Sequence, residues 1–261
     1  MFGSRMTIGI GATLWCLVCG GGAVAAGARA QAPRAVDLSG LPVIERPVAR
    51  RPGPLDGTLA VLLTGDGGWA AGDRGIAQAL QADGVPVVGF VTPSYLRVPR
   101  TPDGAGADLQ RLLTYYLHAW QCERAILVGY SRGADMVPFM VTRLPAGLRG
   151  RVDAVALIGV SKVASFQYQP TDLFADALRF NDYPVLPELQ RLRGLPLLCL
   201  SGERERGSLC PELDSDLARV TTHGGGHVVS REAARAVEQA IVAAVAPPAV
   251  TRPGPPGARR R

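Results

Sequence analysis

Apolar runs alternate with amphipathic segments along the chain from about residue 58 to residue 245. The runs are continuous stretches of Val, Leu and Ile, a pattern that indicates strands buried on both faces. Between them, apolar residues recur three and four positions apart, which indicates helices. We predict strands within 57–65, 85–91, 124–130, 152–160, 195–202 and 217–223, and helices within 73–84, 101–120, 132–144 and 231–245.

This alternation predicts an α/β fold with a mostly parallel sheet and helices on both faces, residues 58–245 forming the domain. Residues 161–193 hold aromatics and prolines without a clear period, so we expect a short cap insertion there. Residues 31–57 read as a lead-in with one edge strand at "PVIERPV", and the Pro-, Gly- and Arg-rich tail 246–261 is expected to be disordered.

The first 30 residues have the pattern of a targeting segment. A short basic start leads into a glycine-rich apolar run and then "ARA", followed by Gln31. This predicts a secretory signal peptide cleaved after Ala30 and a periplasmic protein. An uncleaved N-terminal anchor is the alternative.

The charge balance excludes some function classes. The chain has 261 residues and a net charge of +6, and nearly all the positive charge is arginine, with Lys162 the only lysine. Basic and aromatic residues do not interleave, and no zinc-type Cys/His spacing occurs, so we expect no nucleic-acid partner, metal or cofactor. The basic excess favours an anionic membrane surface or a phosphate-bearing substrate.

The sequence "VGYSRGAD" places Ser131 between a predicted strand and a predicted helix. Gly-x-Ser-x-Gly in this context is the signature of a nucleophile elbow, whose tight turn requires small flanking residues such as Gly129 and Gly133. The pattern therefore predicts that Ser131 is a catalytic nucleophile in an α/β-hydrolase fold.

The base and the acid should follow Ser131 in the order acid, then histidine. Among the three histidines we favour His227, which follows a run of glycines and opens the last helix, with His223 as the alternative; His118 lies in a predicted helix. For the acid we favour Glu205, three residues after the glycine that ends a strand, with Glu203 as the alternative.

Two backbone N–H groups are needed to stabilise an oxyanion. We assign one to Arg132, directly after the nucleophile, and the other to Asp66 or Gly67 in "TGDGGW". Cys199 and Cys210 bracket the acid loop, and in an exported protein we expect them to form a disulfide.

Several segments resemble one bacterial family over about residues 58–245, namely "LLTGDGGWAAGDRGIAQAL", "LVGYSRGADMVPF", "LCLSGERERGSLCPEL" and "GGGH". They are similar to the virulence protein VirJ and to the related C-terminal domain of AcvB. The chain departs from that family by having Arg132 where Phe is frequent and Val228 where an aromatic is common.

The resemblance implies a periplasmic serine hydrolase that removes the aminoacyl group from an aminoacylated phospholipid of the lysyl-phosphatidylglycerol type. Arg74, Arg100 and Arg132 are candidates for its phosphate. The ammonium candidates are Asp66, Asp73 and Asp135, although a structural role is favoured for Asp135. The alternative is an exported interaction protein that serves a type IV secretion apparatus and binds its proteins.

Overall fold

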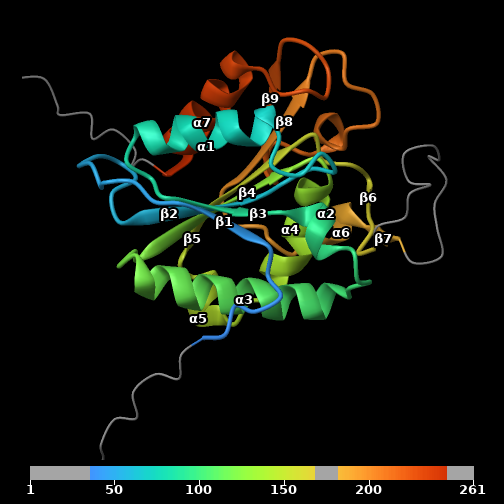
Figure 1. Ribbon diagram of the computed structural model, residues 1–261. Coiled ribbons are helices and arrows are strands. Elements are labelled where there is room, and N and C mark those ends of the chain that lie inside the picture. Colours follow the sequence, from blue (N-terminus) through green and yellow to red (C-terminus); the bar gives the residue numbers. More distant parts are fainter. Residues whose placement is uncertain (1–35, 168–181, 246–261) are drawn as a thin grey trace, which may run out of the picture. The chain divides into compact units, whose positions relative to one another are not determined.

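The computed structural model describes residues 36–167 and 182–245. Its centre is a seven-stranded sheet in the order β1-β3-β2-β4-β5-β8-β9 (Figure 1), parallel except for β1, which pairs antiparallel with β3. The signal peptide and the tail that we predicted lie outside the described residues. The strands are β1 Val43–Arg46, β2 Thr58–Leu63, β3 Val87–Phe90, β4 Arg124–Tyr130, β5 Val152–Ile158, β8 Leu197–Gly202 and β9 Arg219–His223.

The central strands are the apolar runs of the sequence. All six residues of β2 and of β8 are buried, because helices cover both faces of the sheet. β1 lies at the edge, where the lead-in was predicted to add a strand, and its last two residues are exposed. The predicted α/β-hydrolase architecture, mostly parallel with helices on both sides, is confirmed.

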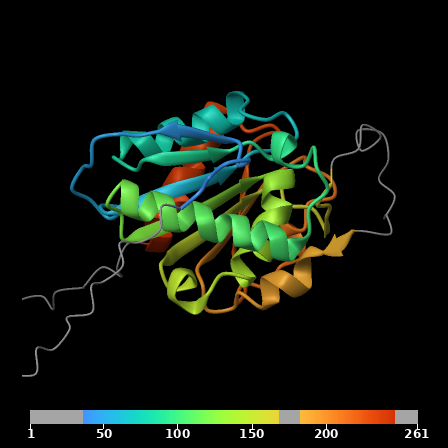
Figure 2. The same ribbon diagram turned by 60° about the horizontal axis from the view of Figure 1, so that its bottom comes forward.

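Helices form two layers against the sheet. Figure 1 shows α1 and α7 over one face and α3, α4 and α5 at the other, and in the turned view of Figure 2 α3 crosses in front of the sheet. Each face has its own core of apolar side chains. No helix in the described ranges is long and apolar enough to cross a bilayer. The helices are α1 Ala71–Ala82, α2 Thr92–Tyr95, α3 Pro102–Ala119, α4 Arg132–Thr142, α5 Ala146–Arg149, α6 Val185–Gln190 and α7 Arg231–Val245, with a 3₁₀ turn η2 at Cys210–Glu212.

The described part of the predicted insertion, residues 161–167 and 182–193, is anchored on α4. It contains a two-stranded sheet, β6 Val163–Ala164 with β7 Tyr183–Pro184, followed by α6. Phe139 of α4 meets the rings of Phe166 and Tyr183 edge-to-face, with centroids 5.5 and 5.9 Å away. The short helices α2, α5 and α6 were not predicted, because four to six residues are too few for a helical period to be recognised.

Candidate active site

Ser131 stands on the sharp turn between β4 and α4. Its backbone has φ 53° and ψ −124°, a conformation that a non-glycine residue adopts only when its surroundings enforce it. The backbone N–H of Ser131 donates to the carbonyl of Ile158 on the neighbouring strand, at 2.8 Å. Strained backbone at a strand-to-helix turn is the geometry that a nucleophile elbow requires.

The two flanking glycines are required by close backbone contacts. A Cβ atom at Gly129 would lie 2.5 Å from the Cα of Ala134, and one at Gly133 would lie 2.2 Å from the carbonyl oxygen of Leu63. Both distances are far below van der Waals contact. The Gly-x-Ser-x-Gly spacing therefore lets α4 turn back directly over the ends of β2 and β4.

His227 connects Ser131 to a carboxylate. Its Nε2 lies 2.8 Å from Ser131 Oγ, and its Nδ1 lies 2.5 Å from Glu205 Oε1. With Nδ1–H donating to Glu205, Nε2 has a lone pair to accept the serine proton. Glu203 is exposed, and its backbone N–H donates to the carbonyl of His223. Of the two acids left open by the sequence, Glu205 is the one in contact with the imidazole.

Glu205 is held in place from both sides. Its Oε2 accepts the backbone N–H of Gly202 at 2.9 Å, and its side chain is only 6% exposed. Burial opposes ionisation, but the hydrogen bonds from His227 and Gly202 leave the pKa of Glu205 below its ordinary value. The hydrogen bond to Glu205 in turn raises the pKa of His227. The pair is arranged to stabilise an imidazolium.

A disulfide closes the loop that carries Glu205. Cys199 of β8 is bonded to Cys210, the first residue of η2, as the sequence predicted for an exported protein. Leu209, the neighbour of Cys210, donates its N–H to the carbonyl of Val160 at 2.8 Å. The acid loop is thus tied at its base to two strands.

The other two histidines lie outside this arrangement. His223, the last residue of β9, is 7% exposed, and its Nδ1 lies 3.1 Å from the carbonyl oxygen of Gly224. His118 is an exposed residue of α3. His227 is therefore the histidine that contacts the serine.

Three residues that contact Ser131, His227 or Glu205 were not predicted from the sequence. Gly159, with φ +64°, follows β5, and a Cβ there would come 2.7 Å from His227 Cε1 and 2.9 Å from Glu205 Oε1. Tyr130 stacks on the His227 ring at 5.6 Å and donates its hydroxyl to the His227 carbonyl at 3.0 Å. Gly65 faces the serine, since a Cβ there would lie 3.0 Å from Ser131 Cβ. The one feature of the sequence that could have identified them is their position at or just after the carboxyl ends of predicted strands.

The loop proposed for the oxyanion hole adjoins Ser131. The N–H of Gly68 donates to the carbonyl of Gly65 at 3.0 Å, closing a turn that contains Asp66 and Gly67. The carboxylate of Asp66 forms a two-point ion pair with the guanidinium of Arg132, which links this loop to the start of α4. The assignment of the N–H groups of Asp66, Gly67 and Arg132 to an oxyanion hole stays a prediction.

The phosphate candidates are engaged in different ways. Arg100 lies over the Tyr95 ring, 4.4 Å from its centroid, and donates to the Tyr95 carbonyl. Arg74 is exposed at the start of α1 and donates to the carbonyl of Trp69 at 2.8 Å. Neither contact involves Ser131 or His227, and their substrate roles stay predictions.

The buried carboxylates Asp73 and Asp135 have structural partners. Asp135 accepts the N–H of Ser161 at 2.7 Å, and Asp73 accepts the N–H of Ala70 at 3.1 Å. Burial raises the pKa of Asp135 to about 7 and that of Asp73 to about 6. These contacts support the structural role already favoured for Asp135 and extend it to Asp73.

Comparison with a family model decides the relationship. The model of the bacterial virulence protein VirJ matches residues 57–246. The chain belongs to the VirJ family. No curated protein matches the sequence significantly. The family match spans the hydrolase domain and includes the elbow, the acid loop and the His227 loop.

Solved structures with a similar fold include esterases and a lipase. Est1E from Butyrivibrio proteoclasticus, with ferulic acid bound, has a TM-score of 0.57 at 12% identity over 80% of this chain and 98% of its own. The monoacylglycerol lipase of Paleococcus ferrophilus has a TM-score of 0.50 at 14% identity, over 78% of this chain and 99% of its own. TT1662 from Thermus thermophilus has a TM-score of 0.52 at 16% identity, over 78% of this chain and 94% of its own. At these identities the likeness establishes the α/β-hydrolase fold.

Proposed function

We propose that this protein is an exported serine hydrolase that removes the aminoacyl group from aminoacyl-phosphatidylglycerol. The observation that carries the proposal is the continuous hydrogen-bonded chain from Ser131 through His227 to Glu205. A serine in strained backbone, a histidine with a raised pKa and a buried carboxylate form the set required for acyl transfer.

In the proposed reaction Ser131 Oγ attacks the ester carbonyl carbon while His227 Nε2 takes its proton. The resulting oxyanion accepts hydrogen bonds from the N–H of Arg132 and from that of Asp66 or Gly67. As the tetrahedral intermediate collapses, the C–O bond to the glycerol breaks and His227 returns the proton to the leaving oxygen. Water, activated by the same histidine, then hydrolyses the acyl-serine and frees the amino acid.

The aminoacylated substrate is supported by family membership and by the charges beside Ser131. Asp66 is the ammonium candidate with an accessible carboxylate, its side chain being 32% exposed, whereas Asp73 and Asp135 are buried. Its partner Arg132 supplies a neighbouring positive charge that suits a phosphodiester. We therefore propose that the Arg132–Asp66 pair meets the phosphate and the ammonium of the substrate.

The direct test uses the mature protein and vesicles that contain lysyl-phosphatidylglycerol. We expect free lysine to be released by the parent protein and not by Ser131→Ala. A neutral short-chain ester, assayed in parallel, distinguishes a wrong substrate from a lack of hydrolase activity. Cleavage of that ester alone would leave a serine hydrolase with a different substrate. Cleavage of neither would favour the secretion-platform alternative.

The cellular test compares a deletion strain with one that carries Ser131→Ala. We expect aminoacyl-phosphatidylglycerol to accumulate equally in both strains, because the variant retains the fold but not the nucleophile. Normal lipid content in the Ser131→Ala strain, with a phenotype only in the deletion strain, would contradict the proposed reaction.

A further inference from the structure

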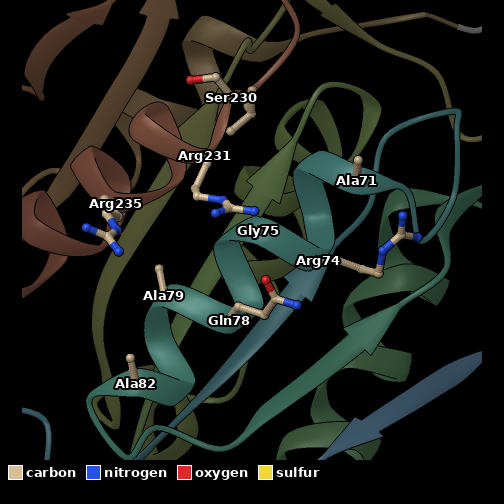
Figure 3. Close-up of a pocket in the computed structure, with 10 residues that line it drawn as sticks. Ala71, Arg74, Gly75, Gln78, Ala79, Ala82, Ser230, Arg231 and Arg235 are labelled. Atoms are coloured by element: carbon tan, nitrogen blue, oxygen red, sulfur yellow. The ribbon is translucent and has the colours of Figure 1, made fainter.

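A basic groove runs between α1 and α7, next to the proposed active site but separate from it. It has a volume of about 660 Å³ and is shown in Figure 3. Arg231 reaches from α7 toward α1 at Gly75, while Arg74 extends from α1 in another direction. The groove is lined by Ala71, Arg74, Gly75, Gln78, Ala79, Ala82, Val229, Ser230, Arg231 and Arg235.

The groove exists because four of the six α1 residues that line it are small. Ala71, Gly75, Ala79 and Ala82 leave no side-chain bulk between the two helices. At its floor the helices are in contact, since a Cβ at Gly75 would lie 3.4 Å from Ala234 Cβ. Long polar side chains thus surround a hollow whose base is closed by contact between the two helices.

The arginines that line this groove form no ion pair with a carboxylate of the described residues. Within residues 36–167 and 182–245, no carboxylate lies within 4 Å of the guanidinium of Arg74, Arg231 or Arg235. Glu232 is the neighbouring acid on α7, and it is fully exposed. No acidic residue lines the groove.

A second arginine-rich hollow, at the amino ends of β4, β5 and β8, provides the contrast. Three of its four arginines, Arg124, Arg191 and Arg193, pair with Asp153, Glu188 and Asp216 respectively, and Arg149 is the fourth. Its positive charge is therefore largely compensated within the protein. Arginines left without a carboxylate around a hollow indicate a site for an external anion, and the planar guanidinium fits phosphate oxygens in pairs.

The groove begins where the His227 loop ends. Val229 and Ser230 line it, and a Cβ at Gly72 would touch both Val229 Cβ and the Tyr130 ring at 3.4 Å. Tyr130 in turn contacts His227. Val228, between His227 and the groove, is 77% exposed. An exposed apolar side chain beside unpaired cations is the combination that binds at a lipid surface.

We propose that this groove binds the phosphate of an anionic phospholipid headgroup and so holds the active site against the membrane. Arg231 and Arg235, one turn apart on α7, are the principal cations. This inference goes beyond the proposed hydrolysis, because it concerns lipid binding at a groove away from Ser131. It applies equally to a variant that cannot hydrolyse the substrate.

The test measures binding to vesicles in the Ser131→Ala background, which separates it from catalysis. Vesicles of equal parts phosphatidylglycerol and phosphatidylcholine are compared with phosphatidylcholine alone. We expect Arg231→Gln/Arg235→Gln to lower the affinity for the anionic vesicles roughly twentyfold, since each arginine near an anionic surface contributes a factor of about five.

The matched control is Arg149→Gln/Arg219→Gln, two exposed arginines outside the groove whose loss changes the net charge equally. We expect it to change the affinity less than about twofold, because diffuse electrostatics are largely screened beyond a Debye length. Equal losses in the two double variants would overturn the groove as a site, as would unchanged binding by Arg231→Gln/Arg235→Gln. Thermal melts of every variant check that the fold is retained.

A second experiment uses inorganic phosphate as the probe. It distinguishes a site for a lipid phosphate from a site for free phosphate. We expect weak phosphate binding, lost in Arg231→Gln/Arg235→Gln together with the affinity for anionic vesicles. Phosphate binding that this variant loses while its vesicle affinity is unchanged would identify a free-anion site and overturn the lipid assignment.

Discussion

The nucleophile loop and the histidine loop are held in place in different ways. Ser131 is fixed by backbone contacts: the glycines of its turn press against β2 and α4, and its N–H donates to the carbonyl of Ile158. His227 lies on an exposed loop after three consecutive glycines, and its side chain is 46% exposed. Its position depends on contacts with Glu205, Tyr130 and Ser131, which come from other segments.

The difference separates what each loop contributes. The elbow is determined by close backbone packing, so a change there disturbs the chemistry or the fold. The position of His227 is determined by a few contacts that involve side chains, so graded changes around it should give graded losses of activity. Four substitution experiments test this comparison, in order of decreasing effect.

The largest effect is expected from removing either reacting side chain. Ser131→Ala and His227→Ala should each lower kcat by about 10⁴-fold to 10⁶-fold, and the double variant no further, because the two act as a unit. Steady-state hydrolysis of an ester substrate measures this. His223→Ala is the matched control and should keep most of the activity, since His223 contacts the backbone of its own loop. A severe loss in His223→Ala alone would reverse the assignment of the base.

Glu205→Gln should lower kcat by about 10³-fold to 10⁴-fold, because the imidazole can then adopt the wrong tautomer. It should also move the pH profile. In the parent the hydrogen bond to Glu205 raises the pKa of His227, and the base must be neutral, so activity is lost as pH falls through that raised pKa. In Glu205→Gln this acidic limb should shift to lower pH.

Glu203→Gln is the matched control for the acid, because Glu203 lies two positions before Glu205 in the same loop and is exposed. We expect its pH profile and its kcat to be close to those of the parent. A shifted acidic limb in Glu203→Gln, with a normal one in Glu205→Gln, would contradict the geometry around His227.

Gly159→Ala should lower kcat by about 10-fold to 100-fold, because its Cβ would come within 3 Å of both His227 and Glu205 and push the pair apart. Gly57→Ala is the control. Gly57 also has positive φ, at +74°, but an added Cβ would meet nothing within 4 Å. Both substitutions carry left-handed backbone strain of about 1–2 kcal/mol, and Gly159→Ala adds the clash, so it should lower the melting temperature at least as much as Gly57→Ala while only Gly159→Ala loses activity. Equal activities would show that the close approach is not needed.

The smallest effect is expected for Tyr130→Phe. The substitution removes the hydroxyl that donates to the His227 carbonyl and retains the ring that stacks on the imidazole. A hydrogen bond of this kind contributes about 1 kcal/mol, so kcat should fall about fivefold. A loss as large as that of Glu205→Gln would mean that Tyr130 takes part in the chemistry rather than in positioning.

Much of the fold was predictable because buried parallel strands must be continuous apolar runs. The run at 124–130 is β4, and the amphipathic stretch at 101–120 is α3, with Thr101 capping it by accepting the N–H of Gly104. The elbow was predictable for the same local reason, since a strand, a tight turn and a helix occur within a few residues. The central strands, the long helices and the nucleophile candidate therefore follow from the sequence by itself.

The tertiary structure decided between alternatives that are chemically identical in the sequence. Glu203 and Glu205 occupy one loop, and His223 and His227 another. The pairing of β8 with β9 makes His223 the buried end of a strand and brings Gly202 against Gly226, where a Cβ would lie 2.3 Å from the carbonyl oxygen. This contact directs Glu205 and His227 toward each other. The direction of a loop side chain depends on residues distant in sequence, so composition and spacing determine which residues are available and packing determines which of them meet.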